Sequence, residues 1–166
     1  NDLDFALRYA LANREMMITR AVEAIDSVIG ADADCDSFIN RNHNHAEFKA
    51  GRWIHRRGAR HAGRGMMGVI PGNMRDGSFI VRGKGNPDSL CSSSHGAGRV
   101  LGRKAAKRTL SMNAFSDTMK GVVANVKEST LDESPFAYKN IFEVMKLQAD
   151  LVDTVSLIRP LVNIKG

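Results

Sequence analysis

The chain has 166 residues of ordinary globular composition, since 43% are hydrophobic and 25% are charged. This length suits one domain that buries about two-thirds of the surface of its unfolded chain. No apolar run approaches the ~20 residues that a membrane-spanning helix needs. The two cysteines, Cys35 and Cys91, are too few for a disulfide scaffold. We therefore expect a cytoplasmic protein without a membrane partner.

The net charge of +6 is concentrated in the middle of the chain. From Arg41 to Arg108 there are 15 Lys and Arg against three acids, a net charge of +12, so the remainder carries −6. A basic block attracts phosphate-rich partners such as nucleotides or nucleic acid. A solvated basic surface explains the same charge equally well, so charge alone does not choose between them.

A helix is predicted over residues 3–29, because apolar residues recur there at spacings of three, four or seven. Asp2 or Asp4 suits its start and Gly30 suits its end. Such a stripe usually packs against the rest of the protein. An acidic turn at 31–37 follows the helix.

The rest of the chain predicts short elements separated by glycine-rich segments. Strands are expected at 52–56, 78–82, 121–126 and 161–164, loops at 58–68 and 83–98, and helices from 99–107 and 109–119. Asn140 and Glu143 form a capping box that predicts a helix to about Ile158, ended by Pro160. We therefore predict an α+β fold in which residues 1–166 form one region.

Two histidines alternate in the segment NHNH. Neutral imidazole is a common metal ligand, but His43 and His45 would point to opposite sides of an extended segment. They would not both bind one ion. Two surface histidines account for the same pattern.

The segment SSSHGAGR at 92–99 is the motif that points most clearly to a chemical function. Gly96 and Gly98 permit close backbone approach, so successive N–H groups could hold phosphate oxygens. His95 would project into the same space, where a neutral imidazole can attack the α-phosphorus of a bound triphosphate. Arg99 lies beside it to balance charge. The other interpretation is a glycine turn into a helix with an incidental histidine.

Several blocks in order along the chain resemble the RtcB family of RNA ligases. They are NHN (42–44), HRRGA (55–59), GVIPGNM (68–74), SFIVRGKGN (78–86), SSSHGAGR (92–99), PFAYKNI (135–141) and IKG (164–166), and the opening RYALANREMM (8–17) is also similar. The resemblance is to the C-terminal part of the family, so we expect an RtcB-like fold that lacks the N-terminal half. That half would supply most of the metal ligands.

The resemblance implies an enzyme that uses GTP and Mn²⁺ to join RNA ends bearing a 2′,3′-cyclic phosphate or 3′-phosphate to 5′-hydroxyl ends. It implies a GMP-histidine intermediate on His95 and a manganese ligand in His43. It assigns the remaining nucleotide contacts to Asn44, Pro71, Gly72, Asn73, Met74, Ser78, Gly96, Ala97, Gly98, Tyr138 and Lys165, beside His43 and His95.

The implied partners are tRNA halves or broken RNA, an N-terminal half in cis or in trans, and an archease-type activator. The sequence departs from the family pattern at Asn73, where Ser is usual, and at Arg75, where Gly is usual. Arg57 replaces Lys and Gly102 replaces Ser. These departures favour an alternative, a degenerate or split paralogue that binds RNA or a nucleotide without catalysis.

Overall fold

A computed structural model describes residues 2–42 and 44–164 and divides the chain into two compact units, residues 1–60 and 61–166. The first unit contains the helix α1 (Asp2–Ile29) and the strands β1 (His45–Lys49) and β2 (Arg52–Arg56). The predicted helix and the predicted strand at 52–56 are both confirmed. The short strand β3 (Ala59–His61) lies at the boundary of the two units, within the predicted loop.

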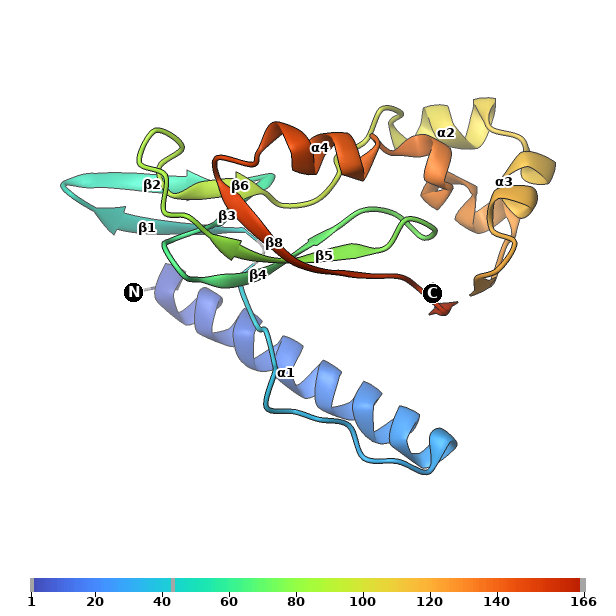
Figure 1. Cartoon of the computed structure of the whole chain (residues 1–166), viewed down its shortest axis with the longest axis horizontal. Coiled ribbons are helices and arrows are strands. Elements are labelled where there is room, and N and C mark those ends of the chain that lie inside the picture. Colours follow the sequence, from blue (N-terminus) through green and yellow to red (C-terminus); the bar gives the residue numbers. More distant parts are fainter. Residues whose placement is uncertain (1, 43, 165–166) are drawn as a thin grey trace. The chain divides into compact units, whose positions relative to one another are not determined.

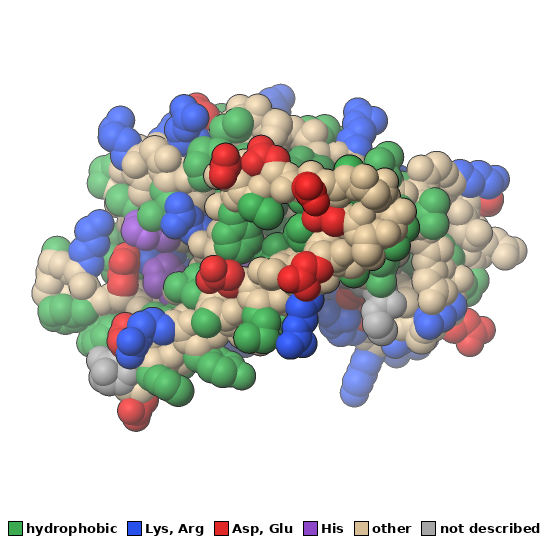
Figure 2. Space-filling view, turned by 90° about the horizontal axis from the view of Figure 1, so that it is seen from below, with side chains coloured by type: hydrophobic (Ala, Val, Ile, Leu, Met, Phe, Trp, Pro, Cys, Tyr) green, Lys and Arg blue, Asp and Glu red, His purple; other side chains and the backbone are tan. Residues whose placement is uncertain are grey.

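The helix α1 ends where the sequence predicts. Gly30 takes a left-handed conformation with φ of 68°, and its N–H donates to the carbonyl of Asp26 at 2.8 Å. None of the described residues of α1 is buried, so most of the predicted apolar stripe stays exposed, with Leu7 and Ala10 half-buried. Figure 2 shows hydrophobic side chains among charged ones on one face of the molecule.

The strands β1 and β2 form an antiparallel hairpin with a two-residue turn. Ala50 and Gly51 both have positive φ, 49° and 73°, as the tightest hairpin turns require. Near the base of the hairpin, buried Arg56 donates to the Glu47 carboxylate at 2.8 Å, which satisfies a charge that would otherwise be costly to bury.

The second unit is built on a three-stranded antiparallel sheet, in the order β4 (Met67–Pro71), β5 (Ser78–Gly83) and β8 (Val152–Ile158). Figure 1 shows these strands side by side, with the helix α4 (Ile141–Leu147) beside them. Ile141 and Met145 of α4 share one apolar core with Ile70, Phe79 and Val81 of the sheet.

A second apolar cluster lies among short helices. The elements are α2 (Arg103–Thr109), α3 (Met112–Thr118) and the 3-10 helices η1 (Glu128–Glu133) and η2 (Pro135–Ala137). Met74, Phe115, Met119 and Leu131 are buried together in this cluster. The remaining strands are β6 (Ser92–Ser94) and the parallel pair β7 (Val123–Ala124) and β9 (Val162–Asn163).

The long helix predicted from Asn140 to about Ile158 is wrong in its second half. Asn140 does cap the helix, since its side chain accepts from the N–H of Phe142 at 2.9 Å, but α4 ends at Leu147. Residues 152–158 form β8 instead and pair with the central strand β5. Their β-branched residues and polar alternation suit a strand, and the ladder to β5 satisfies their backbone groups.

Candidate nucleotide site

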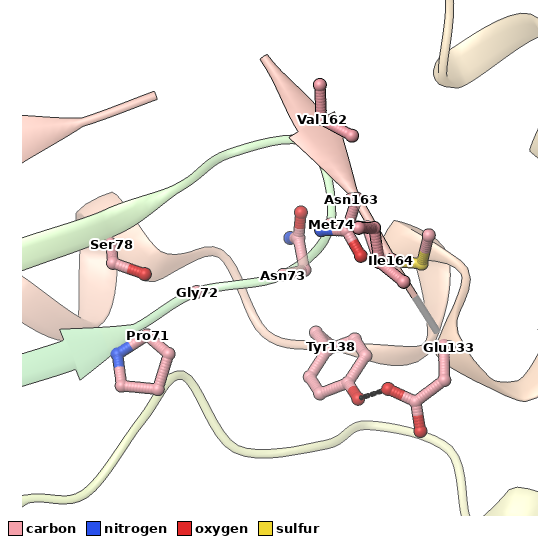
Figure 3. A pocket seen from close by; sticks show the side chains of 10 residues that line it. All are labelled: Pro71, Gly72, Asn73, Met74, Ser78, Glu133, Tyr138, Val162, Asn163 and Ile164. Atoms are coloured by element: carbon pink, nitrogen blue, oxygen red, sulfur yellow. Dashed lines mark hydrogen bonds between the residues drawn. The ribbon is translucent and has the colours of Figure 1, made fainter. Parts of the chain in front are cut away.

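A cavity of about 470 Å³ opens in the second unit, a size within the usual range of small-molecule sites. Its lining comes from the turn after β4, from the segment around η2, and from β9 near the end of the chain (Figure 3). The lining residues are Pro71, Gly72, Asn73, Met74, Ser78, Glu133, Tyr138, Val162, Asn163 and Ile164.

The turn that forms one wall is held by its own side chains. The Asn73 carboxamide oxygen accepts from the backbone N–H groups of Arg75 and Asp76 at 3.0 and 2.9 Å, and its nitrogen donates to the Asp76 carboxylate at 2.7 Å. Arg75 donates to Asp76 at 2.6 Å and to Thr118 of α3 at 2.6 Å. Partial burial opposes ionisation of Asp76, but the hydrogen bonds from Arg75 and Asn73 outweigh it and lower its pKa.

The opposite wall is a phenol fixed by two charged side chains. The Tyr138 hydroxyl donates to the Glu133 carboxylate at 2.6 Å and accepts from the Arg99 guanidinium at 3.0 Å. The same guanidinium lies 4.8 Å from the centre of the Tyr138 ring. Burial and the bond to Glu133 raise the pKa of Tyr138 to about 12, so the phenol is neutral at physiological pH.

The loop that carries His95 is anchored on both sides. Before it, Ser94 is hydrogen-bonded twice to the buried side chain of Gln148. After it, the N–H of Ala97 donates to the carbonyl of Pro71 at 2.9 Å. A Cβ on Gly96 would stand 3.1 Å from that carbonyl, so the glycine permits this approach. The half-buried His95 therefore sits in a loop packed on a wall of the cavity.

The next residues join this loop to the tyrosine segment. Gly98 takes a left-handed conformation with φ of 75°, and its carbonyl accepts from the N–H of Lys139 at 3.0 Å. Arg99 and Tyr138 then form an antiparallel bridge. The His95 loop is thus tied to both walls of the cavity, through Pro71 on one side and through Tyr138 on the other.

Arg103 of α2 is hydrogen-bonded to two acidic side chains. Its guanidinium donates to the carboxylates of Asp132 and Glu133 at 2.6 and 2.7 Å. Burial of Asp132 would raise its pKa, but the bond from Arg103 and the charge of Lys107 outweigh burial and lower it. Asp132 is therefore ionised, and Arg103 and Lys107 balance its charge.

The structure places the predicted site residues in three groups. Pro71, Gly72, Asn73, Met74, Ser78 and Tyr138 line the cavity. His95, Gly96, Ala97 and Gly98 form the loop bonded to Pro71. Asn44 is exposed in the first unit, just before β1. The predicted residues His43 and Lys165 lie outside the described residues.

Beyond the apolar Val162 and Ile164, sequence reasoning missed three polar residues of this site. Glu133 lies five positions before Tyr138, a spacing with no recognisable motif. Asn163 lines the cavity because β9 pairs with β7, a contact between distant segments. Gln148 reaches Ser94 across 54 positions of the chain. The only available signal was that Asn163 directly precedes the IKG block.

Comparison with known proteins decides the family. The family model described as tRNA-splicing ligase RtcB matches residues 1–166. The chain belongs to the RtcB family. It is 37% identical to the RNA-splicing ligase RtcB of Escherichia coli K12 over 171 residues, which cover 98% of this chain and 42% of the relative. It is 30% identical to the tRNA-splicing ligase RtcB of Archaeoglobus fulgidus over 190 residues, covering 95% of this chain and 39% of the relative.

This RtcB-family chain spans less than half the length of these relatives. The expected α+β class is confirmed by the mixed helices and strands of the structure. Both cysteines, Cys35 and Cys91, are free. Within residues 2–42 and 44–164, no helix is long and apolar enough to cross a membrane.

Proposed function

We propose that this chain is the nucleotide-binding and histidine-bearing part of a GTP- and Mn²⁺-dependent RNA ligase. The enzyme would join RNA ends bearing a 2′,3′-cyclic phosphate or a 3′-phosphate to 5′-hydroxyl ends. The observation that carries the proposal is the hydrogen bond from Ala97 to Pro71, which joins the His95 loop to the wall of the cavity.

The cavity suits a guanine nucleotide in size and in the kinds of group that line it. Tyr138 offers an aromatic face, while Asn73, Ser78 and Asn163 offer hydrogen-bonding groups. The glycine loop from Gly96 to Gly98 would bring backbone N–H groups to the phosphates. Pockets for small molecules are commonly built in this way, from apolar walls with a few placed polar groups.

His95 would act as the nucleophile. A ring nitrogen of neutral imidazole would form a bond to the α-phosphorus of GTP, while the bond from that phosphorus to the bridging oxygen breaks and pyrophosphate leaves. The Arg99 guanidinium donates hydrogen bonds to the Tyr138 hydroxyl and to backbone carbonyls, so Arg99 orders the loop. Manganese, when bound, would neutralise the triphosphate. Its predicted ligand His43 lies outside the described residues.

The remaining parts of the proposal rest on the family resemblance and the charge pattern. The basic stretch from Arg41 to Arg108 would receive the RNA backbone of tRNA halves or broken RNA. An N-terminal half, in cis or in trans, would complete the metal site. We also propose an archease-type activator as a partner and the cytoplasm as the location.

The test is transfer of radiolabel from GTP to the protein in the presence of Mn²⁺. The chain is incubated alone, and together with the part of Escherichia coli RtcB that precedes its matching segment. We expect label only in the mixture, and loss of label in His95→Ala. His55→Ala is the matched control, because His55 is an exposed histidine of β2, outside the segment that forms the loop. Absence of label in every mixture would contradict the proposal.

A non-catalytic RNA-binding or nucleotide-binding paralogue is the second candidate. The Asn73 carboxamide is hydrogen-bonded to Arg75 and Asp76, so it has fewer hydrogen-bonding groups left for a nucleotide. This observation favours the second candidate. Under this function, the reconstituted protein binds RNA but never ligates it, with or without His95. Under the first, His95→Ala abolishes ligation.

A further inference from the structure

The tip of the β1–β2 hairpin exposes two aromatic rings that the proposed reaction does not use. Phe48 and Trp53 are directly opposed in the register, and their ring centres lie 5.5 Å apart at an interplanar angle of 59°. Both rings are largely exposed, at 63% and 59%. Such a cross-strand pair stabilises a hairpin, but this degree of exposure leaves much apolar ring surface in water.

Two cations adjoin these aromatic residues in the sequence, and strand alternation places them on the other face of the hairpin. Lys49 and Arg52 are opposed in the register on either side of the turn, and both are exposed. Like charges directly across a hairpin destabilise it. An anionic ligand would relieve that repulsion, whereas a neutral partner would not. The tip therefore offers aromatic faces and paired positive charge within one short segment.

We propose that the tip of this hairpin, Phe48 to Trp53, binds single-stranded RNA. Unpaired bases would stack on the rings of Phe48 and Trp53, and Lys49 and Arg52 would contact the flanking phosphates. Every base has a π-face, so such a site would bind single strands of different base sequences. The choice of RNA as the polymer rests on the proposed function, while the combination of rings and cations comes from the hairpin itself. The site would hold a substrate strand outside the nucleotide cavity.

The experiment uses the fluorescence of Trp53, which is the only tryptophan of the chain. The 166-residue chain is titrated with single-stranded oligoadenylate of about ten nucleotides, which fits the size of single-strand sites. Inorganic polyphosphate of the same charge is the control ligand without bases. We expect oligoadenylate to quench Trp53 and polyphosphate to leave its emission unchanged.

Variants separate stacking from charge. Phe48→Ala should weaken oligoadenylate binding about tenfold, and Phe48→Tyr should preserve it, because only the first removes a ring. Replacing Lys49 and Arg52 together by Gln should reduce the slope of log affinity against log salt by about 1.4, the value for two phosphates of a single strand. Leu147→Ala, an exposed apolar change in α4, should leave affinity unchanged.

Three results would overturn the inference. The first is that Phe48→Ala binds oligoadenylate as tightly as the unchanged chain. The second is that polyphosphate quenches Trp53 as strongly as oligoadenylate does. Either result would show that the site binds anions through charge and not through base stacking. Emission that changes with protein concentration in the absence of RNA would assign the rings to a second copy of the chain. The radiolabel transfer to His95 is independent of this measurement. A chain that binds oligoadenylate but takes no label in any mixture would therefore refute the proposed function alone.

Discussion

Gln148 and Ser94 are joined by two hydrogen bonds across 54 positions of the chain. The Ser94 N–H donates to the Gln148 carboxamide oxygen at 2.9 Å, and the carboxamide nitrogen donates to the Ser94 hydroxyl at 2.8 Å. The Gln148 side chain is 5% exposed. This buried pair holds the backbone immediately before His95, so it couples the end of α4 to the candidate nucleophile.

Removing this pair should lower both stability and labelling. Gln148→Ala leaves the Ser94 N–H without its partner and should cost ~1–3 kcal/mol of the free energy of unfolding. Ser94→Ala removes only the hydroxyl bond and should cost less. Denaturant unfolding measures both, and GTP labelling of the reconstituted enzyme should fall in the same order. Equal effects of the two variants would contradict a role for the bond to the Ser94 N–H.

The phenol of Tyr138 should resist ionisation. Burial and the Glu133 carboxylate raise its pKa from 10 to about 12. Because the folded state holds this proton more tightly than the unfolded state, the stabilisation is complete below pH 10. It is lost as the pH rises through 12. Absorbance titration of a Tyr9→Phe variant isolates this phenol, since the chain has two tyrosines.

The control for this titration is Glu133→Gln, which removes the charge that the phenolate would face. The pKa of Tyr138 should then fall, although burial still holds it above its ordinary value. An unchanged pKa in Glu133→Gln would show that the bond to Glu133 does not contribute.

Gly77 should be the least replaceable residue of the cavity turn. It has φ of 88°, and a Cβ there would stand 2.1 Å from the Ile158 carbonyl oxygen of β8. Gly121 has a similar φ of 93° with open space around it. Gly121→Ala should therefore cost only backbone strain, ~1–2 kcal/mol. Gly77→Ala should cost clearly more, because the turn and β8 must also separate. Similar melting temperatures for the two variants would contradict this.

The departure at Gly102 should weaken a helix cap. Gly102 is the N-cap residue of α2 in an extended conformation and has no side chain to accept a hydrogen bond, while its surroundings are open. Gly102→Ser, which restores the usual family residue, should stabilise the protein by a few tenths of a kcal/mol. Gly102→Ala adds a side chain without an acceptor and should not stabilise it. Thermal unfolding of the two variants measures the difference.

The sequence alone determined several local elements and indicated a candidate nucleophile. The period of α1, the stop at Gly30 and the strand at Arg52–Arg56 follow from nearby residues, because backbone hydrogen bonding and glycine conformation are local. The ordered motifs also indicated the RtcB family, which the family model then showed. The histidine between serines and glycines, together with these motifs, identified His95 as a candidate nucleophile.

Only the tertiary structure decided which distant segments meet. Residues 152–158 carry apolar side chains compatible with a helix, and pairing with β5 makes them a strand. Glu133 and Asn163 enter the cavity through contacts between remote parts of the chain, as Gln148 reaches the His95 loop. Burial and pairing across such separations depend on the whole fold, because each partner gains its stabilisation only when the other is already in place.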